Sequence, residues 1–217
     1  MGLFSNQKRG NRFKYLRDKV LVFVLNNIDG FFCLGEGEYK YIIQKYKSYE
    51  AKFKFVNFGI DSDFWSNRQS YDVNERDYIL FIGNDLNRDY KFLIDLINTM
   101  PNLKFKVLSN RLYDDDFKMK NVEVINGIWW ENTVSDEEIK NLYRYAKLTI
   151  LPLNDTLQPS GQSVALQSMS MGTPVLITKT KGFWDEEIEN NEHIFFVNQN
   201  NLTLWRERIQ NILFDTS

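Results

Sequence analysis

The chain has 217 residues, enough for one full domain with additions or for two small domains. Hydrophobic residues make up 43% and charged residues 26%, which is typical of globular proteins and excludes a disordered chain. The formal net charge of −2 gives no general reason to bind nucleic acid, and we expect no nucleic-acid partner. A single cysteine (Cys33) and a single histidine (His193) exclude a disulfide framework and a cysteine or multi-histidine metal cluster.

The apolar runs of the sequence are short. None reaches the ~20 residues needed to cross a bilayer. The stretch from Val20 to Leu25 is both too short and too late for a secretory signal peptide. We therefore expect a cytoplasmic protein.

The first 77 residues divide into a short α/β part and a connecting segment. Helical spacing of apolar residues predicts a helix over 12–28, and the all-apolar run 31–34 is typical of a strand buried on both faces. A second helix is expected over 37–48 and a second strand over 53–58. The polar stretch 66–77 lacks periodicity and predicts a linker, so the expected division is 1–65, 66–77 and 78–217.

From residue 78 onward, strands and helices alternate regularly. We expect strands at 78–82, 104–108, 121–125, 147–152, 175–178 and 194–197, and helices at 89–100, 136–145, 160–171, 184–190 and 202–214. Ser135 and Glu138 have the spacing of a capping box at the start of one helix. The alternation implies right-handed βαβ units, an α/β fold and a mostly parallel sheet. Ligands of such sheets bind beyond the carboxyl ends of the strands, so the loops there are the places to look for chemistry.

The first such loop runs from Gly83 to Lys91. Glycine permits close backbone approach, and Arg88 and Lys91 stand near the start of a helix, where the macrodipole disfavours cations. A bound phosphate would neutralise both charges, and Arg88 could hold it in a bidentate fork. The alternative is that Arg88 and Lys91 pair with neighbouring aspartates on a solvated surface.

The second loop, 157–163, follows the expected strand 147–152 and opens a helix. Ser160 and Ser163 can cap the helix, and Gly161 leaves backbone N–H groups accessible to a phosphate or a sugar hydroxyl. The alternative is an ordinary capped helix without a ligand. The loop lacks the lysine of a P-loop, and the chain contains no dinucleotide-binding glycine fingerprint.

The third loop, 182–187, contains Glu186, which could accept hydrogen bonds from a polyol such as a sugar. Acidic residues also suit the first turn of a helix, so a structural role is the alternative. Three further features give only weak evidence of function. Asp114–Asp116 is typical of a solvated loop more than of a metal site, and Trp129-Trp130 could stack on a ring or pack in the core. His193 is expected to be packed. One histidine also disfavours a Ser-His or Cys-His nucleophile.

Together these segments resemble the C-terminal, donor-binding half of a GT-B glycosyltransferase of the family 4 kind (glycosyl transferases group 1). The stretch 56–64, Val-Asn-Phe-Gly-Ile-Asp-Ser-Asp-Phe, resembles the "N-G-V-D-x-x-x-F" between the two domains of that fold. Residues 79–91 are similar to the segment that opens the second domain, and 124–143 to "V-x-F-x-G…D-E-E-L…L-Y". The stretch 167–175, Gln-Ser-Met-Ser-Met-Gly-Thr-Pro-Val, resembles "E-A-M-A-x-G-T-P-V", and Asp185-Glu186 with 195–197 resembles "P-E…G-L-L-V".

The resemblance implies a Rossmann-like parallel sheet flanked by helices over 78–217 and a remnant of the acceptor-side N-terminal domain over 1–65. It implies transfer of a hexose from a nucleotide diphosphate sugar to an acceptor hydroxyl, with retention and without a metal. Catalytic roles fall to Arg88 and Lys91, which would neutralise the leaving diphosphate. The residues expected to bind substrate are Gly83, Gly127 with the loop up to Trp130, Gln158, Ser160, Gly161, Gln162, Ser163, Gln167 and Glu186.

The resemblance also implies partners. The donor substrate is a nucleotide sugar, no cofactor is expected, and the acceptor is a sugar or a lipid-linked sugar in polysaccharide biosynthesis. Peripheral membrane contact is expected of the full-length enzyme. The apolar strands of residues 1–60 would normally be covered on both faces, so we expect dimerisation through this part.

Two departures from the family pattern keep other functions open. The family's E-x7-E carboxylates would fall on Pro159 and Gln167, so both are absent. Most of an N-terminal acceptor-binding domain also has no counterpart in the chain. A non-catalytic nucleotide-binding or partner-binding module that needs another half for activity is therefore the main alternative. A nucleotide-sugar epimerase is disfavoured because the single histidine leaves few acid–base groups.

Overall fold

The computed structural model describes residues 11–67, 73–127, 131 and 133–214. The chain folds into two compact units, which we describe separately. The first consists of residues 1–58 together with the short segments 155–160 and 180–187. The second holds 59–154, 161–179 and 188–217. Two loops of the C-terminal part thus belong to the first unit, a feature that the expected division at 66–77 does not include.

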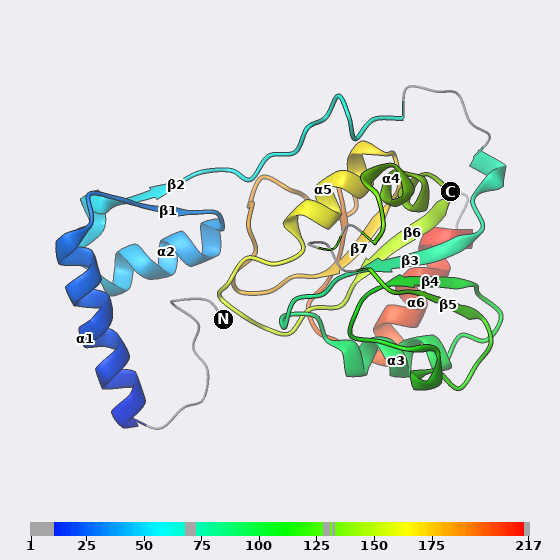
Figure 1. The fold of residues 1–217 in the computed structure, drawn as a ribbon, viewed down its shortest axis with the longest axis horizontal. Coiled ribbons are helices and arrows are strands. Elements are labelled where there is room, and N and C mark those ends of the chain that lie inside the picture. The colour runs from blue at the N-terminus through cyan, green and yellow to red at the C-terminus, as the bar shows by residue number, and fades with distance from the viewer. Residues whose placement is uncertain (1–10, 68–72, 128–130, 132, 215–217) are drawn as a thin grey trace. The chain divides into compact units, whose positions relative to one another are not determined.

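The first unit is built on a two-stranded parallel sheet. Its elements, in chain order in Figure 1, are α1 (Asn11–Asn27), β1 (Phe31–Cys33), α2 (Glu36–Lys45), the 3-10 helix Lys47–Lys52 and β2 (Phe53–Phe55). They follow the expected elements closely, except that the expected second helix ends early and continues as the 3-10 helix. The second strand is also shorter than expected, because β2 ends at Phe55 and not at residue 58.

One face of this small sheet is buried and the other is open. Leu21 and Leu25 of α1 and Ile42 of α2 pack with Cys33 and Phe53 in one hydrophobic cluster. Burial raises the pKa of the Cys33 thiol to about 12. Side chains alternate along a strand, so the residues between the buried ones point to the opposite face. That face is left open.

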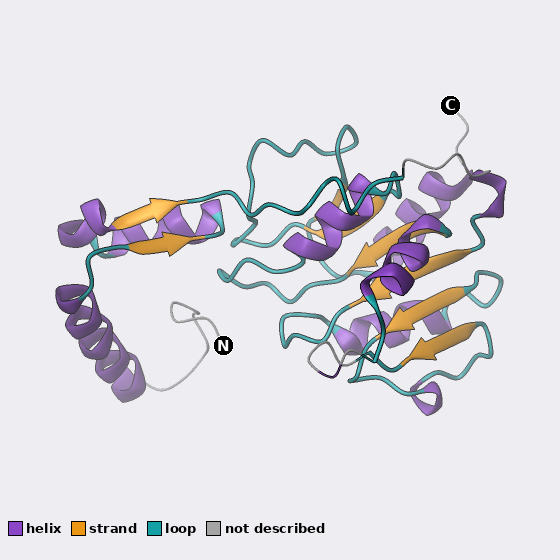
Figure 2. Cartoon of the chain, turned by 45° about the horizontal axis from the view of Figure 1, so that its top comes forward, coloured by secondary structure: helices purple, strands orange, loops and turns teal. Residues whose placement is uncertain are grey.

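The second unit contains a six-stranded parallel sheet. The order across the sheet is β5-β4-β3-β6-β7-β8, and Figure 2 shows the strands side by side. The strands are β3 (Tyr78–Ile82), β4 (Phe105–Leu108), β5 (Val122–Ile125), β6 (Ala146–Leu151), β7 (Val175–Thr178) and β8 (Phe195–Val197). The chain direction across the sheet reverses between β3 and β6, which is the switch point of a doubly wound, Rossmann-like sheet.

Helices cover both faces of this sheet. They are α3 (Tyr90–Asn98), α4 (Asp136–Arg144), α5 (Gln162–Ser170) and α6 (Leu202–Phe214). Helices α3 and α6 contact each other on one face, where Phe92 and Trp205 meet edge to face. Helices α4 and α5 lie over the other face (Figure 1). The strands are therefore apolar on both sides, as the continuous apolar runs in the sequence predict.

Two local expectations were wrong and one was confirmed. The segment 184–190, expected to be a helix, forms turns instead. Ser160 is not the N-cap of α5: that residue is Gly161, whose φ of 82° lies in the left-handed region that favours glycine and which has no side chain to cap the helix. The capping box of Ser135 and Glu138 is present as predicted.

Two searches of the described residues gave no result. No helix among them is long and apolar enough to cross a bilayer. Within the same residues, no group of three or more histidine, cysteine or acidic side chains is arranged to hold a metal ion.

Glu38, in the first turn of α2, makes the stability of the folded chain depend on pH. Burial raises the pKa of this carboxyl to about 7. The folded chain therefore binds a proton that the unfolded chain releases above pH ~4.5, so this group lowers stability progressively as pH rises from ~4.5 to ~7. Glu38→Gln should raise the free energy of unfolding more at pH 8 than at pH 5, by about 1–2 kcal/mol after allowance for partial exposure.

Urea unfolding at the two pH values measures this difference. Glu50→Gln, at an exposed position of the same unit, is the matched control and should leave the pH dependence unchanged. An equal effect of Glu38→Gln at both pH values would contradict the assignment.

Candidate functional site

A cavity of about 350 Å³ opens at the carboxyl ends of β3, β4 and β5 in the second unit. This edge of a parallel sheet is where ligands of doubly wound folds bind. The cavity is lined by the β3–α3 loop, the loop after β5, α4 and α5. The lining residues are Ile82, Gly83, Asn84, Asp85, Arg88, Leu108, Gly127, Val134, Asp136, Ile139, Tyr143, Ser163, Val164 and Gln167.

Arg88 is the central charge of the cavity. Its side chain is only 3% exposed, and its Nη1 lies 3.0 Å from Oδ2 of Asp85. Burial lowers the pKa of this guanidinium, and the Asp85 carboxylate opposes that shift. A Cβ at Gly83 would stand 2.5 Å from Nε of Arg88, so only glycine leaves room for the arginine here. The alternative of a solvated ion pair is therefore excluded for Arg88, although the pairing with a neighbouring aspartate that it included is present.

Gly161 borders the same guanidinium. A Cβ built on this residue would lie 3.8 Å from Nη1 of Arg88. The N-terminal end of α5 thus lies beside the buried arginine, and both features favour a negatively charged group. Gln162, the next residue, is buried on α5 and does not line the cavity.

Asn84 holds together the three loops that form this wall of the cavity. Its Nδ2 donates to the carbonyl oxygen of Gly127 at 2.8 Å, and its Oδ1 accepts from the N–H of Asn110 at 2.7 Å. The side chain thereby links the strand ends of β3, β4 and β5. Gly127 is itself packed closely, because a Cβ there would meet Cδ1 of Leu108 at 2.4 Å.

A buried tyrosine orients Gln167 on the opposite wall. The hydroxyl of Tyr143 on α4 donates to Oε1 of Gln167 on α5 at 3.1 Å, and both residues line the cavity. Tyr143 is fully buried, and burial raises the pKa of its hydroxyl, which therefore remains protonated. With Oε1 occupied in this way, the amide nitrogen of Gln167 is the end that can serve a ligand.

Three predicted site residues belong to the first unit. Gln158 is partly buried in the segment 155–160, and its N–H donates to Oγ1 of Thr156 at 3.1 Å. Ser160 is buried in the same segment. Glu186 lies in the segment 180–187, with a side chain 55% exposed and paired with Lys40.

Five of the predicted residues line one cavity: Gly83, Arg88, Gly127, Ser163 and Gln167. Lys91 is exposed on α3 and does not line it, so its role in neutralising a diphosphate stays a prediction. Trp129 and Trp130 lie outside the described residues. Asp114–Asp116 forms an exposed 3-10 helix. The expectation that His193 is packed is wrong: the residue is exposed, and its Nδ1 accepts a hydrogen bond from the N–H of Glu189.

Sequence reasoning missed the roles of Asn84 and Tyr143. Asn84 had one signal, its place directly after the glycine that ends a strand. Tyr143 is the last residue of the family motif over 124–143, but it stands one helical turn after Ile139, as an ordinary core residue of an amphipathic helix does, so nothing pointed to its contact with Gln167.

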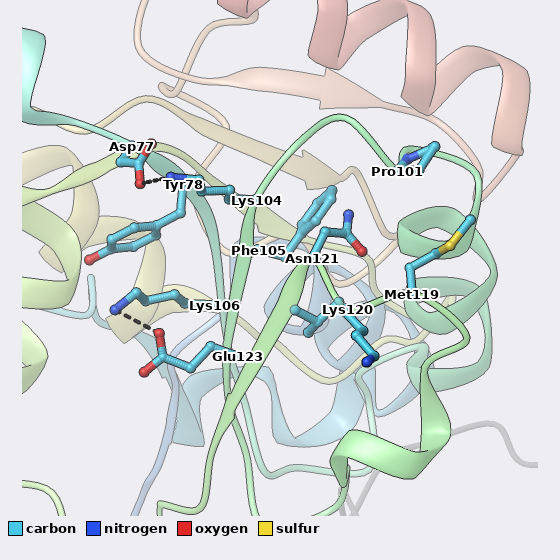
Figure 3. A pocket seen from close by; sticks show the side chains of 11 residues that line it. Asp77, Tyr78, Pro101, Lys104, Phe105, Lys106, Met119, Lys120, Asn121 and Glu123 are labelled. Atoms are coloured by element: carbon cyan, nitrogen blue, oxygen red, sulfur yellow. Dashed lines mark hydrogen bonds and ion pairs between the residues drawn. The ribbon is translucent and has the colours of Figure 1, made fainter.

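A second cavity, of about 700 Å³, lies at the opposite, amino ends of β3, β4 and β5. Figure 3 shows two ion pairs among its side chains, Lys104 with Asp77 at 2.6 Å and Lys106 with Glu123 at 2.9 Å. These four charges neutralise each other, and the segments that line this cavity are those that lead into the strands, not the loops that follow their carboxyl ends. The smaller cavity is therefore the better candidate site.

The comparison with protein families decides the affiliation of the chain. Residues 63–217 match the family described as glycosyl transferases group 1. The chain belongs to this family. No curated protein sequence matches the chain.

Solved structures of low sequence identity share the fold. A crystal structure of HepE from Anabaena in complex with UDP-glucose has a TM-score of 0.71 at 15% identity, over 94% of this chain and 60% of that one. TarM has a TM-score of 0.70 at 14% identity, over 92% of this chain and 39% of that one. WaaG, a glycosyltransferase involved in lipopolysaccharide biosynthesis, has a TM-score of 0.64 at 16% identity, over 84% and 53%.

The fold is therefore that of GT-B glycosyltransferases, and the second unit corresponds to the C-terminal half predicted from the sequence motifs. The chain spans less than two thirds of the length of these relatives.

The link between Tyr143 and Gln167 can be measured through stability. Tyr143→Phe removes a buried hydroxyl that donates to Gln167 and should lower the free energy of unfolding by about 1 kcal/mol. Gln167→Met removes the acceptor, and in its presence Tyr143→Phe should cost less. Urea unfolding of the two single variants and the double variant gives the coupling. Additive effects would show that the two side chains do not interact.

Proposed function

We propose that the chain is the donor-binding part of a glycosyltransferase that moves a hexose from a nucleotide diphosphate sugar to an acceptor hydroxyl. The observation that carries the proposal is the buried Arg88 beside the N-terminal end of α5, in a cavity at the carboxyl ends of parallel strands. A buried cation next to the N-terminal end of a helix suits a diphosphate. Membership of glycosyl transferases group 1 supports the same substrate class.

Each residue has a role in this proposal. Arg88 neutralises the negative charge that develops on the leaving diphosphate, aided by the N–H groups at Gly161–Ser163, and Lys91 adds charge at longer range. Gln167 donates from its amide nitrogen to a hydroxyl oxygen of the ribose. Gly83 and Gly127 allow the nucleotide to approach the backbone. Glu186 accepts a hydrogen bond from a hydroxyl of the sugar. Gln158 and Ser160 add hydrogen bonds to the donor from their loop.

The finer features of the reaction follow the family resemblance. In this proposal transfer retains the anomeric configuration and uses neither a divalent metal nor a cofactor, and the acceptor is a sugar or a lipid-linked sugar. HepE, a structural neighbour, was crystallised with UDP-glucose, which makes a UDP-sugar the first donor to test. The reaction belongs to polysaccharide biosynthesis in the cytoplasm, with peripheral membrane contact in the full-length enzyme.

A second candidate is a nucleotide-binding module without catalytic activity of its own. One observation favours it: Pro159 and Gln167 stand where the family pattern has carboxylates. Catalysis in a two-domain enzyme needs an acceptor held against the donor, an advantage of at best ~7–11 kcal/mol. Both candidates bind the nucleotide, and they differ in whether transfer follows.

Arg88→Ala should weaken binding of the preferred nucleotide sugar at least tenfold. The reason is the loss of charge-assisted hydrogen bonds to the diphosphate, worth about 1.5–3 kcal/mol. Isothermal titration with UDP-glucose, GDP-mannose, UDP and GDP measures the affinity. Arg206→Ala, at an exposed position of α6, is the matched control and should bind like the wild type.

Circular dichroism of both variants establishes that they are folded before titration. If the folded Arg88→Ala variant binds the nucleotide sugar as tightly as the wild type does, the diphosphate does not bind in this cavity. Repeating the wild-type titration in EDTA tests metal independence, and a strict requirement for Mg²⁺ or Mn²⁺ would overturn that part. Assay of sugar transfer then separates the transferase from the non-catalytic module.

The open face of the small sheet supports dimerisation through residues 1–60. Phe32 is 68% exposed, and Leu34 and Val56 beside it are 41% and 43% exposed. Phe32→Ser should reduce self-association at micromolar concentration, because it removes the largest apolar side chain of this face. Sedimentation velocity measures the change, with Leu204→Ser on α6 as the control at an exposed apolar position. A wild type that is monomeric up to ~100 μM would contradict dimerisation.

A further inference from the structure

The start of α2 is capped by a distant loop instead of by its own side chains. Its N-cap residue, Gly35, makes no side-chain capping hydrogen bond. The first N–H groups of a helix need partners outside the helix. Here the N–H of Glu36 donates to the carbonyl oxygen of Trp184 at 3.3 Å, and that of Gly37 donates to Phe183 at 3.2 Å. The segment 180–187 therefore caps the helix through its backbone.

Close packing holds the backbone of that segment from two sides. A Cβ at Gly37 would lie 2.2 Å from the carbonyl oxygen of Lys181, and a Cβ at Gly182 would lie 2.3 Å from the carbonyl group of Leu157. The N–H of Gly182 also donates to the carbonyl oxygen of Thr156 at 2.8 Å. The segment thus lies between α2 and the segment 155–160 with no space for an added methyl group on either side.

The carboxylate of Glu186 is held by the same turn of α2. Oε2 of Glu36 accepts the N–H of Glu186 at 3.0 Å, which fixes the backbone. Nζ of Lys40 pairs with Oε1 of Glu36 at 3.0 Å and with Oε2 of Glu186. These bonds lower the pKa of Glu36 and raise that of Lys40, so both groups stay charged at neutral pH. One oxygen of Glu186 is thus occupied by Lys40, and its Oε1 remains for another donor.

We infer that the first turn of α2 positions the segment 180–187 for the donor sugar. Gly37 places the backbone of that segment, and Lys40 orients the carboxylate of Glu186. The inference rests on the proposed function, in which Glu186 accepts a hydroxyl of the sugar. Lys40 acts through Glu186 and is a positioning residue. The consequence is specific: the turn contributes to the recognition of the sugar and not of the nucleoside diphosphate.

The test compares two ligands that differ only by the sugar. Affinities are measured for UDP-glucose and UDP, or for GDP-mannose and GDP if the wild type binds that pair. Lys40→Met should weaken binding of the nucleotide sugar threefold to tenfold and leave binding of the nucleoside diphosphate unchanged. Lys40→Arg should restore most of the loss, because it keeps a charged donor at this position. Lys54→Met, at an exposed position of β2, is the control.

Glu186→Gln should cause a similar selective loss. In that background Lys40→Met should add nothing further, because Lys40 acts only through this carboxylate. A wild-type ratio of the two affinities in Lys40→Met, or losses that multiply in the double variant, would overturn the inference while leaving the proposed function intact.

Hydrogen exchange tests the backbone part without any ligand. Gly37→Ala should speed exchange of the amides of 182–186 at least tenfold, because the added methyl group displaces the carbonyl of Lys181. Gly59→Ala is the matched control, since a Cβ there meets nothing within 4 Å. Unchanged exchange in Gly37→Ala would overturn the placement of the segment by α2. If the wild type binds neither ligand pair, the proposed function fails, and with it the role in sugar recognition.

Discussion

The burial of one charge, the Arg88 guanidinium, determines the construction of the candidate site. A buried cation is costly unless partners surround it, and Asp85 supplies an opposite charge at 3.0 Å. The space for the side chain comes from two positions without side chains, Gly83 and Gly161. Because the guanidinium is already desolvated and held in place, an anion entering the cavity meets a preorganised charge. Little reorganisation is then needed at the moment of reaction, which is the condition under which electrostatic stabilisation is strongest.

A buried polar network places the second wall of the site. The hydroxyl of Ser168 on α5 donates to Oγ1 of Thr149 on β6 at 2.8 Å, and the hydroxyl of Thr173 donates to the carbonyl oxygen of Tyr143 at 2.7 Å. These bonds fix α5 against the sheet and against the end of α4, where Gln167 meets Tyr143. The family motif over 167–175 therefore has a structural part, the two hydroxyls, beside the part that faces the ligand.

Much of the fold could be predicted from the sequence because its signals are local. The strand Tyr78–Ile82 is an apolar run closed by a glycine, and its bounds agree with the structure. The segment 184–190 could not be predicted in the same way. Its acidic residues are typical of a helix start, but Phe183 and Trp184 are buried and stacked 4.7 Å apart, and their carbonyl oxygens accept from α2. Contacts with residues far away in the chain outweigh local helix propensity there.

The residues of the candidate site likewise include some that could be predicted from local sequence signals and some that could not. Gly83, Arg88 and Gly127 could be predicted because residues at strand ends meet at one edge of a parallel sheet. The contact of Tyr143 with Gln167 joins residues 24 positions apart on two helices, and no periodicity predicts which side chains of packed helices meet. The start of α5 was predicted to carry a serine cap, since serine is the common choice. The left-handed backbone at Gly161 takes that place and lies close to the guanidinium of Arg88.

The state of Cys33 has a practical consequence for experiments on this chain. The only thiol of the sequence is 1% exposed, and its pKa of about 12 leaves almost no thiolate at neutral pH. Since the thiolate is the reactive species, maleimide reagents should not modify the wild-type chain. A cysteine introduced at an exposed position, such as Glu187→Cys, would then take up a fluorophore or spin label alone. The native cysteine need not be removed before distances or loop motions are followed by spectroscopy.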